Sequence, residues 1–198
     1  LFLEAFSATP HAAQEDQARL PLAPLVAGGD RLAFTTDSFV VEPLEFPGGN
    51  IGTLAVCGTV NDLVVGGARP VALSAAFILA KRLELPCLRR IVTAIADCAH
   101  KAGMRIVTSG TKVVPKGACD GLYVTTSGVG IIPAGRAISI TAARPGDVVL
   151  VNGTLGDHGA AILCARGDLA LDVAIASDCA PLGGLVEALL AAAPNTCS

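Results

Sequence analysis

The clearest periodicity in this sequence lies between residues 87 and 102. Apolar side chains recur there every three or four residues, while polar side chains fall on the opposite face. The apolar positions are Leu88, Ile91, Val92, Ile95, Cys98, Ala99 and Ala102. Pro86 suits the first turn of a helix, Lys101 the last turn and Gly103 the residue beyond it. The segment is therefore predicted to be an amphipathic helix with one face in a core.

Residues 51–66 form a second predicted helix, which is apolar around most of its circumference. Asn50 is a favourable N-cap, and Gly66 followed by Gly67 is a typical helix end. A helix that is apolar on nearly all sides is expected to be buried. The preceding residues, 42–50, are predicted to be a loop because of their Pro and Gly content.

The remaining apolar runs predict four strands, at residues 31–36, 71–79, 104–108 and 122–132. The first strand is expected to end at Asp37 and Ser38, and residues 9–11 and 21–30 before it are expected to be loop. In chain order the elements are strand, helix, strand, helix, strand, strand. This order predicts an α+β fold, with one mixed four-stranded sheet and helices on one of its faces.

A new structural unit is predicted to begin near Ala143, just before the turn at residues 145–147. The chain is accordingly divided into domains at 1–143 and 144–198. The second part holds one predicted strand and two predicted helices, at 148–151, 159–166 and 182–193. These elements are too few to form a hydrophobic core of their own. This part is therefore predicted to be the incomplete beginning of a C-terminal domain.

The composition argues against several function classes. Hydrophobic residues make up 52% of the 198 residues, charged residues make up 16%, and the net charge is −3. This is the profile of a globular protein without a basic field for nucleic acid or an anionic membrane. The apolar runs fall short of the roughly 20 residues of a membrane span. The chain starts without a signal-peptide pattern or an initiator Met, so its upstream end is expected to be missing.

The seven cysteines, at positions 57, 87, 98, 119, 164, 179 and 197, show no metal-like spacing. Most of them lie in apolar stretches, where a thiol behaves as a small hydrophobic group. They are expected to be reduced thiols of a cytoplasmic protein.

Polar residues at the end of the first predicted strand are candidates for binding phosphate and metal. The run Thr35-Thr36-Asp37-Ser38 offers one carboxylate and several hydroxyls. Magnesium takes one or two carboxylates together with phosphate and water oxygens, so Asp37 is a candidate ligand. The alternative is that Asp37 only caps a turn.

Two further polar positions stand out. Asn61 and Asp62 interrupt the apolar helix, where polar groups are costly unless they are paired or bind an ion. Lys112 follows small residues after a short strand, and its ammonium could neutralise a phosphate. The alternatives are a narrow solvated stripe for Asp62 and an ordinary surface position for Lys112.

The glycines at 153, 156 and 159 lack the opening of a dinucleotide-binding loop. They are interpreted as allowing tight packing between a strand and a helix. His158 between them is interpreted as a structural residue.

Taken together and in order, six stretches of the chain resemble the HypE family of hydrogenase-maturation carbamoyl dehydratases. These proteins belong to the PurM-like, or AIR synthase-like, superfamily. The matching stretches are residues 34–41, 47–52, 57–63, 111–117, 156–159 and 177–182. The resemblance implies a PurM-like N-terminal domain over 1–143 that binds ATP and uses a sheet face to form a homodimer, with ATP near the subunit interface.

The resemblance also implies an activity. A HypE-type enzyme uses ATP to dehydrate a carbamoyl group on its carboxy-terminal cysteine to a thiocyanate, which supplies cyanide to the iron of [NiFe]-hydrogenase. The implied partners are a HypF-like carbamoyltransferase and HypC/HypD-like iron-loading proteins. No nucleic acid or membrane partner is implied.

For individual residues, the resemblance assigns Asp37 and Asp62 to Mg²⁺. It places Thr35, Thr59, Asn61, Thr111 and Lys112 with these two aspartates at ATP. We expect the carboxylates of Asp37 and Asp62 and the amine of Lys112 to converge on a magnesium triphosphate.

Three departures from the family pattern affect this assignment. Gly110 stands where a metal-binding aspartate is expected, and the early Gly-rich phosphate segment and the cysteine-bearing tail are not found. Cys197 lacks the context of an acceptor cysteine, so no catalytic residue is assigned and the chain alone is expected to be inactive. The alternatives are a non-catalytic dimerising or partner-binding relic, or another PurM-like ATP-dependent enzyme. A selenophosphate synthetase is the least favoured of these, because no reactive cysteine with an adjacent lysine lies near the start.

Overall fold

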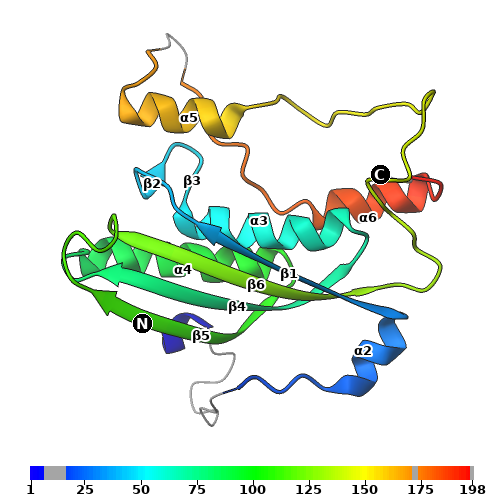
Figure 1. The fold of residues 1–198 in the computed structure, drawn as a ribbon, viewed down its shortest axis with the longest axis horizontal. Coiled ribbons are helices and arrows are strands. Elements are labelled where there is room, and N and C mark those ends of the chain that lie inside the picture. Colours follow the sequence, from blue (N-terminus) through cyan, green and yellow to red (C-terminus); the bar gives the residue numbers. More distant parts are fainter. Residues whose placement is uncertain (7–16, 171–173, 197–198) are drawn as a thin grey trace.

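A four-stranded mixed sheet organises the molecule (Figure 1). The computed structural model describes residues 1–6, 17–170 and 174–196. The sheet has the order β1-β6-β4-β5, in which only β4 and β5 are parallel. The strands are β1 (Arg31–Phe39), β4 (Arg69–Ala80), β5 (Arg105–Val114) and β6 (Leu122–Ile132). The predicted α+β fold is thereby confirmed.

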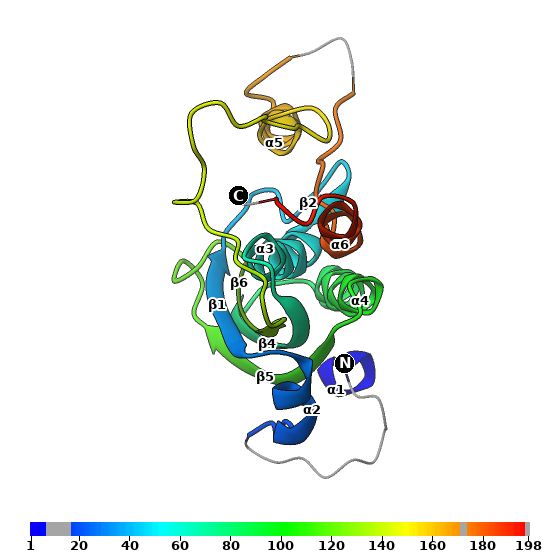
Figure 2. The same cartoon turned by 90° about the vertical axis from the view of Figure 1, so that its right-hand side faces the viewer.

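Two helices, α3 (Ile51–Val65) and α4 (Leu85–Lys101), cover one face of this sheet (Figure 2). The core lies between them and the inward-facing residues of the strands. Its largest fully buried side chains include Phe77, Ile51, Leu73, Ile91, Ile95 and Leu122. Both helices were predicted, and α4 buries six of the seven apolar positions of the periodic pattern.

Asn50 caps α3 as predicted, because its Oδ1 accepts hydrogen bonds from the backbone N–H groups of Gly52 and Thr53 at 2.9 and 3.1 Å. Thr53 Oγ1 in turn accepts from the Asn50 N–H at 2.8 Å, which completes a capping box. The predicted loop before the helix contains a small hairpin of β2 (Glu45–Phe46) and β3 (Gly49–Asn50). The positive φ of Gly48 permits the turn between them.

Two short helices precede the sheet. The rings of Phe2 in α1 (Phe2–Phe6) and Phe77 in β4 lie 4.8 Å apart, so α1 extends the core beside β5. The predicted loop over 21–30 is wrong, because α2 (Leu22–Gly28) forms there and packs against β6 around Ile131. The loop predicted at 9–11 lies outside the described residues.

The strands β1 and β5 are longer than predicted. Asp37 lies inside β1, where it pairs with Thr126 of β6. Residues 109–112 belong to β5 rather than to a loop. The pairing between β4 and β5 includes Ala75 with Ser109 and continues as far as Ala80 with Val114. Hydrogen bonding to a neighbouring strand therefore overrides the local polarity that suggested strand ends.

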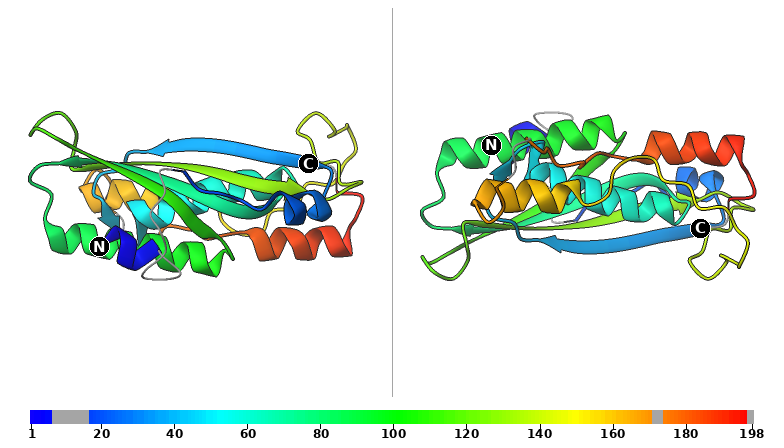
Figure 3. Two further views of the ribbon diagram at one scale, coloured as in Figure 1. Left: turned by 90° about the horizontal axis from the view of Figure 1, so that it is seen from below. Right: turned by 90° about the horizontal axis from the view of Figure 1, so that it is seen from above.

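The second part of the chain adds α5 (Asp157–Arg166) and α6 (Gly183–Ala192), as predicted. Figure 3 shows them toward opposite ends of α3, where α6 packs against α3 and α5 packs against β2. The strand predicted at 148–151 is wrong, because these residues form no strand and are 61 to 85% exposed. An extended segment needs a hydrogen-bonded neighbour to become a strand, and none of the described residues supplies one. The domain boundary near Ala143 stays a prediction.

Candidate functional site

The carboxylates that could bind an ion, Asp37 and Asp62, lie where β1 runs along α3. We call this region the β1–α3 seam and define it by Thr35, Asp37, Gly58 and Asp62. The hydroxyl of Thr35 donates a hydrogen bond to Asp62 Oδ2 at 3.1 Å. Asp37 lies two residues farther along β1 and therefore on the same face as Thr35. Both aspartates, 25 positions apart in the sequence, are thereby brought to one seam.

A glycine allows this close approach of strand and helix. A Cβ atom at Gly58 would lie 2.7 Å from Cζ of Phe39, which is closer than real Cβ atoms come to other heavy atoms. Because Thr35 contacts Asp62 and Phe39 contacts Gly58, β1 and α3 run in opposite directions along the seam. Asp37 lies between these two contacts on β1.

The two aspartates are exposed to solvent. One oxygen of Asp62 is oriented by Thr35, and Asp37 Oδ1 accepts from the N–H of Ser38 at 2.7 Å. Within the described residues, no three His, Cys, Asp or Glu side chains are grouped so that they could hold a metal ion. Two carboxylates with open coordination suit Mg²⁺ that arrives with phosphate and water ligands, so the residues fit the expected ion.

Thr59, predicted to contact the nucleotide, lies in the core with no exposed surface. Its hydroxyl is 2.6 Å from that of Thr126, which donates to the backbone oxygen of Ala55 at 3.0 Å. These bonds satisfy a polar group inside the apolar helix and link α3 to β6. The position of Thr59 is explained by packing.

Asn61 is also occupied by the protein itself. Its Nδ2 donates to the backbone oxygen of Ala180 at 3.0 Å, and its Oδ1 accepts from the N–H of Leu182 at 2.8 Å. The side chain thus anchors the segment at 177–182 to α3. Nothing in the sequence pattern around Asn61 indicated this partner, because the two stretches are about 120 positions apart.

The structure does not bring Lys112 to the aspartates within one chain. Lys112 and Thr111 lie on β5, and β6 and β4 separate that strand from β1. Three strand spacings correspond to about 14 Å. Asp37 is level with Ser109, three residues from Lys112, so Lys112 points to the opposite face of the sheet. The expected convergence of the three groups in a single chain is therefore wrong.

The face that carries Lys112 is the one that α3 and α4 leave uncovered, and we call it the open face. Its exposed apolar side chains include Leu32 at 62%, Phe34 at 70% and Ile78 at 41%. Gly110 lies on the same face, and a Cβ atom there would meet nothing within 4 Å. An apolar sheet face of this kind is typical of a protein interface.

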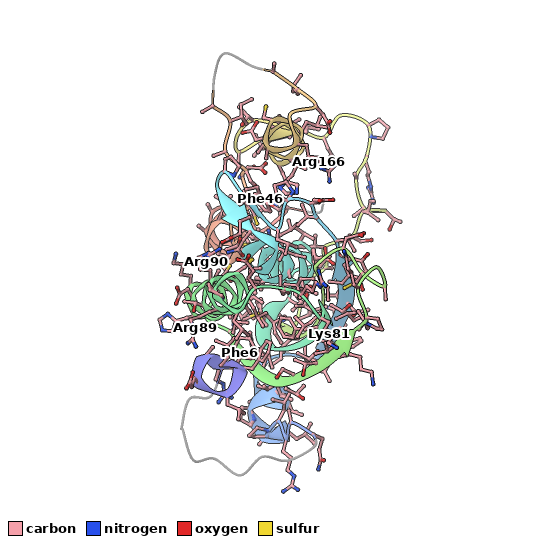
Figure 4. The ribbon with its side chains drawn as sticks, turned by 90° about the vertical axis from the view of Figure 1, so that its left-hand side faces the viewer. Phe6, Phe46, Lys81, Arg89, Arg90 and Arg166 are labelled. Carbon is pink, nitrogen blue, oxygen red and sulfur yellow. The ribbon has the colours of Figure 1, made fainter. Side chains whose placement is uncertain are left out.

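Several contacts around the β2–β3 hairpin were not predicted. Arg90 forms a bidentate pair with Glu45 at 2.8 and 2.6 Å, and its guanidinium lowers the pKa of that carboxyl. Arg166 Nε donates to the backbone oxygen of Glu42 at 2.6 Å. Figure 4 shows Arg90 on α4 and Arg166 on α5, on two sides of Phe46. The hairpin is therefore tied to α4, and the residues just before it are tied to α5.

His158 packs edge-on against Phe46, with ring centroids 5.3 Å apart. Its Nδ1 lies 2.9 Å from Ser177 Oγ, and the Ser177 N–H donates to the backbone oxygen of Pro47 at 2.8 Å. These contacts join α5 and the 177–182 segment to the hairpin. They agree with the structural interpretation of His158.

Comparison with known proteins places the chain in a family. Residues 14–132 match the family described as "AIR synthase related protein, N-terminal domain". The chain is also 66% identical over 181 residues to "Carbamoyl dehydratase HypE" of Rhodobacter capsulatus, covering 91% of this chain and 53% of that protein. The chain thus spans about half the length of the curated relatives it matches.

Solved structures agree with this match. A crystal structure of E. coli HypE superposes with a TM-score of 0.90 at 55% identity, over 95% of this chain and 58% of that one. A HypE structure in complex with ATP gives 0.87 at 46% identity, over 96% and 55%. A HypE–HypF complex gives 0.79 at 50% identity, over 81% and 53%.

Proposed function

This chain belongs to the AIR synthase related family, and from that premise we propose that it is the ATP-binding part of a HypE-type carbamoyl dehydratase in [NiFe]-hydrogenase maturation. The single observation that carries the proposal is the hydrogen bond from Thr35 to Asp62. It orients one carboxylate beside the strand that carries the other, as binding of a magnesium triphosphate requires. The ATP complex of a similar protein supports the same nucleotide.

In the proposed reaction, ATP phosphorylates the amide oxygen of a cysteine-bound carbamoyl group, and loss of phosphate leaves a thiocyanate. Mg²⁺, when bound, would neutralise charge on the phosphate oxygens. The chain's own contribution is positioning. Asp37 and Asp62 would hold the ion and Thr35 would fix one carboxylate, while the acceptor cysteine is unassigned.

Lys112 has a role in this proposal only if it comes from a second copy of the chain. Its place on the open face, whose apolar side chains are exposed, supports a homodimer in which the open faces meet. A nucleotide at the rim of that interface would contact the aspartates of one copy and Lys112 of the other. Because burying the exposed apolar side chains removes them from water, dimerisation is favourable.

The proposed partner is a HypF-like carbamoyltransferase, supported by the complex of a similar protein with HypF. HypC/HypD-like proteins are proposed as acceptors of the cyanide. Among the described residues, no helix is both long and apolar enough to cross a membrane. The proposed location is the cytoplasm, which is supported by the six described cysteines being free thiols.

One observation favours a second candidate. Gly110 takes the place of an expected carboxylate, so a non-catalytic relic that dimerises without binding Mg-ATP is the alternative. A different PurM-like ATP-dependent enzyme is a less favoured alternative, because the identity to HypE proteins is high.

Calorimetric titration with Mg-ATP distinguishes these candidates. We expect saturable binding by the wild-type chain and almost none by Asp62→Asn or Lys112→Ala alone. An equal mixture of the two variants, allowed to exchange subunits, should regain part of the wild-type stoichiometry, because a mixed dimer contains one intact site. Absence of binding by the wild type would support the relic. Binding lost in both variants and not regained on mixing would refute the shared site.

A further inference from the structure

Three thiols from separate parts of the chain gather beside α3. Cys57 lies on α3 and Cys98 on α4, and their sulfur atoms are 3.4 Å apart. Cys179 precedes α6 and packs against the core cluster that contains Cys57. Cys57 and Cys98 are 3 and 5% exposed, whereas Cys179 is partly exposed to solvent. The proposed function uses none of these groups.

The anchoring of the 177–182 segment holds Cys179 against the part of the core that contains Cys57. On α3, Cys57 and Asn61 are four residues apart and therefore lie one above the other on the same face. Asn61 holds the backbone at Ala180 and Leu182. On the other side of Cys179, Ser177 is bonded to the hairpin through Pro47, and its hydroxyl accepts from the N–H of Cys179 at 3.2 Å. Cys179 is thus fixed between two anchors.

The environment distinguishes the three thiols. Hydrogen bonds with Cys179 and Cys98 raise the pKa of the Cys57 thiol, and burial raises it further. The hydrogen bond from Cys57 lowers the pKa of Cys179, although burial partly opposes this shift. Cys98 has a pKa lowered by the same donor, but it is buried between helices. A thiol that has a lowered pKa and is accessible to solvent is the one that oxidants modify first.

From this arrangement we infer that Cys179 and Cys57 form a redox-modification site, in which a peroxide oxidises Cys179 and Cys57 resolves the product as an intramolecular disulfide. The inference does not depend on the proposed function. The disulfide would add a covalent link between α3 and the 177–182 segment, which Asn61 holds by hydrogen bonds.

The chemistry balances with hydrogen peroxide as the oxidant. The Cys179 thiolate attacks one peroxide oxygen, the O–O bond breaks, and the products are a sulfenic acid at Cys179 and, after protonation, water. The Cys57 sulfur then attacks the Cys179 sulfur, the S–O bond breaks, and the hydroxyl leaves as a second water with the proton from Cys57. Two thiols are oxidised to one disulfide, and one peroxide is reduced to two waters.

Peptide mapping of the oxidised full chain tests the inference. Hydrogen peroxide is added to the reduced protein, free thiols are blocked, and a tryptic digest is analysed by mass spectrometry without reduction. Trypsin places Cys57, Cys98 and Cys179 on three separate peptides. Cys179 and Cys197 lie on the same tryptic peptide, and fragment-ion sequencing distinguishes which of them is cross-linked. We expect the Cys57–Cys179 pair to exceed any other cross-link several-fold and to disappear on reduction.

Variants separate the two steps. Cys57→Ser should leave a sulfenic acid at Cys179 that dimedone traps, and Cys179→Ser should abolish the cross-link. Cys164→Ser is the matched control, because Cys164 is also partly exposed but lies on α5. If peroxide modifies Cys164 in the wild-type protein while no Cys57–Cys179 peptide forms, or if Cys57 links only to Cys98, the inference is wrong. The wild-type map decides this even where a variant does not fold.

Discussion

The hydroxyl of Thr35 on β1 donates to Oδ2 of Asp62 on α3 at 3.1 Å, so a strand residue orients a carboxylate of the neighbouring helix. Thr35→Val keeps the shape of the side chain and removes the donor. Because partners that orient a metal ligand typically contribute 10- to 100-fold to affinity, we expect Mg-ATP binding about tenfold weaker in this variant. Asp62→Asn should be weaker still.

Calorimetry with Mg-ATP measures both effects. Asp97→Asn is the matched control, because Asp97 is an exposed carboxylate on the outer side of α4. A Thr35→Val variant that binds as well as the control would exclude an orienting role for Thr35.

Introducing a carboxylate at position 110 should strengthen metal binding. A Cβ atom at Gly110 meets nothing within 4 Å, so Gly110→Asp fits without a clash. An added carboxylate beside Lys112 on the open face should raise the apparent Mg²⁺ affinity at fixed ATP by about tenfold. Titration of Mg²⁺ against ATP binding measures this.

Ser109→Asp is the control for this substitution. It introduces the same charge on the neighbouring residue, but on the opposite face of β5. Equal gains in both variants would indicate a general effect of charge rather than a site at the open face.

Asn61 is expected to stabilise the attachment of the 177–182 segment to α3. Asn61→Ala removes two hydrogen bonds to the 177–182 segment, each worth about 1 kcal/mol. The Leu182 amide should then exchange with deuterium faster than in the wild type, while the amides of β4 keep their protection. Asn61→Asp retains an acceptor for the Leu182 N–H and should give an intermediate rate. Unchanged exchange in Asn61→Ala would show that other contacts hold the segment.

Acid should weaken the attachment of α6. Arg136 pairs with Glu187 through two bonds of 2.7 and 3.1 Å, and this lowers the pKa of the Glu187 carboxyl below its ordinary value of 4.5. A carboxyl whose pKa is lower in the folded state stabilises that state above pH 4.5, and the contribution is lost as the pH falls through the lowered pKa. The pair is partly exposed, so we expect at most about 1 kcal/mol at neutral pH.

The free energy of unfolding of the wild type and Glu187→Gln, measured between pH 7 and pH 3, tests this expectation. The wild type should be the more stable at neutral pH, and the two curves should converge in acid. Parallel curves over the whole range would contradict the assignment.

Much of the fold could be predicted from the sequence because its causes are local. Asn50, the apolar run after it and Gly66 define α3 within one stretch of chain. The periodic positions of α4 face the core because helical geometry places them on one side. The two aspartates were singled out because a carboxylate after an apolar run and another in an apolar helix are unusual, although Asp37 lies inside β1 and not at its end. Their binding of Mg²⁺ stays a proposal.

Tertiary structure alone decided the rest. Residues 109–114 are a strand because β4 lies beside them, and 148–151 are not one because no described strand does. The strand order places Lys112 on β5, which β6 and β4 separate from β1. The alternation of side chains along β5 directs Lys112 to the open face. Neither the order of strands in a sheet nor the partner of a side chain such as Asn61 is fixed by neighbours in sequence. Both depend on which surfaces bury the most apolar area when the whole chain packs.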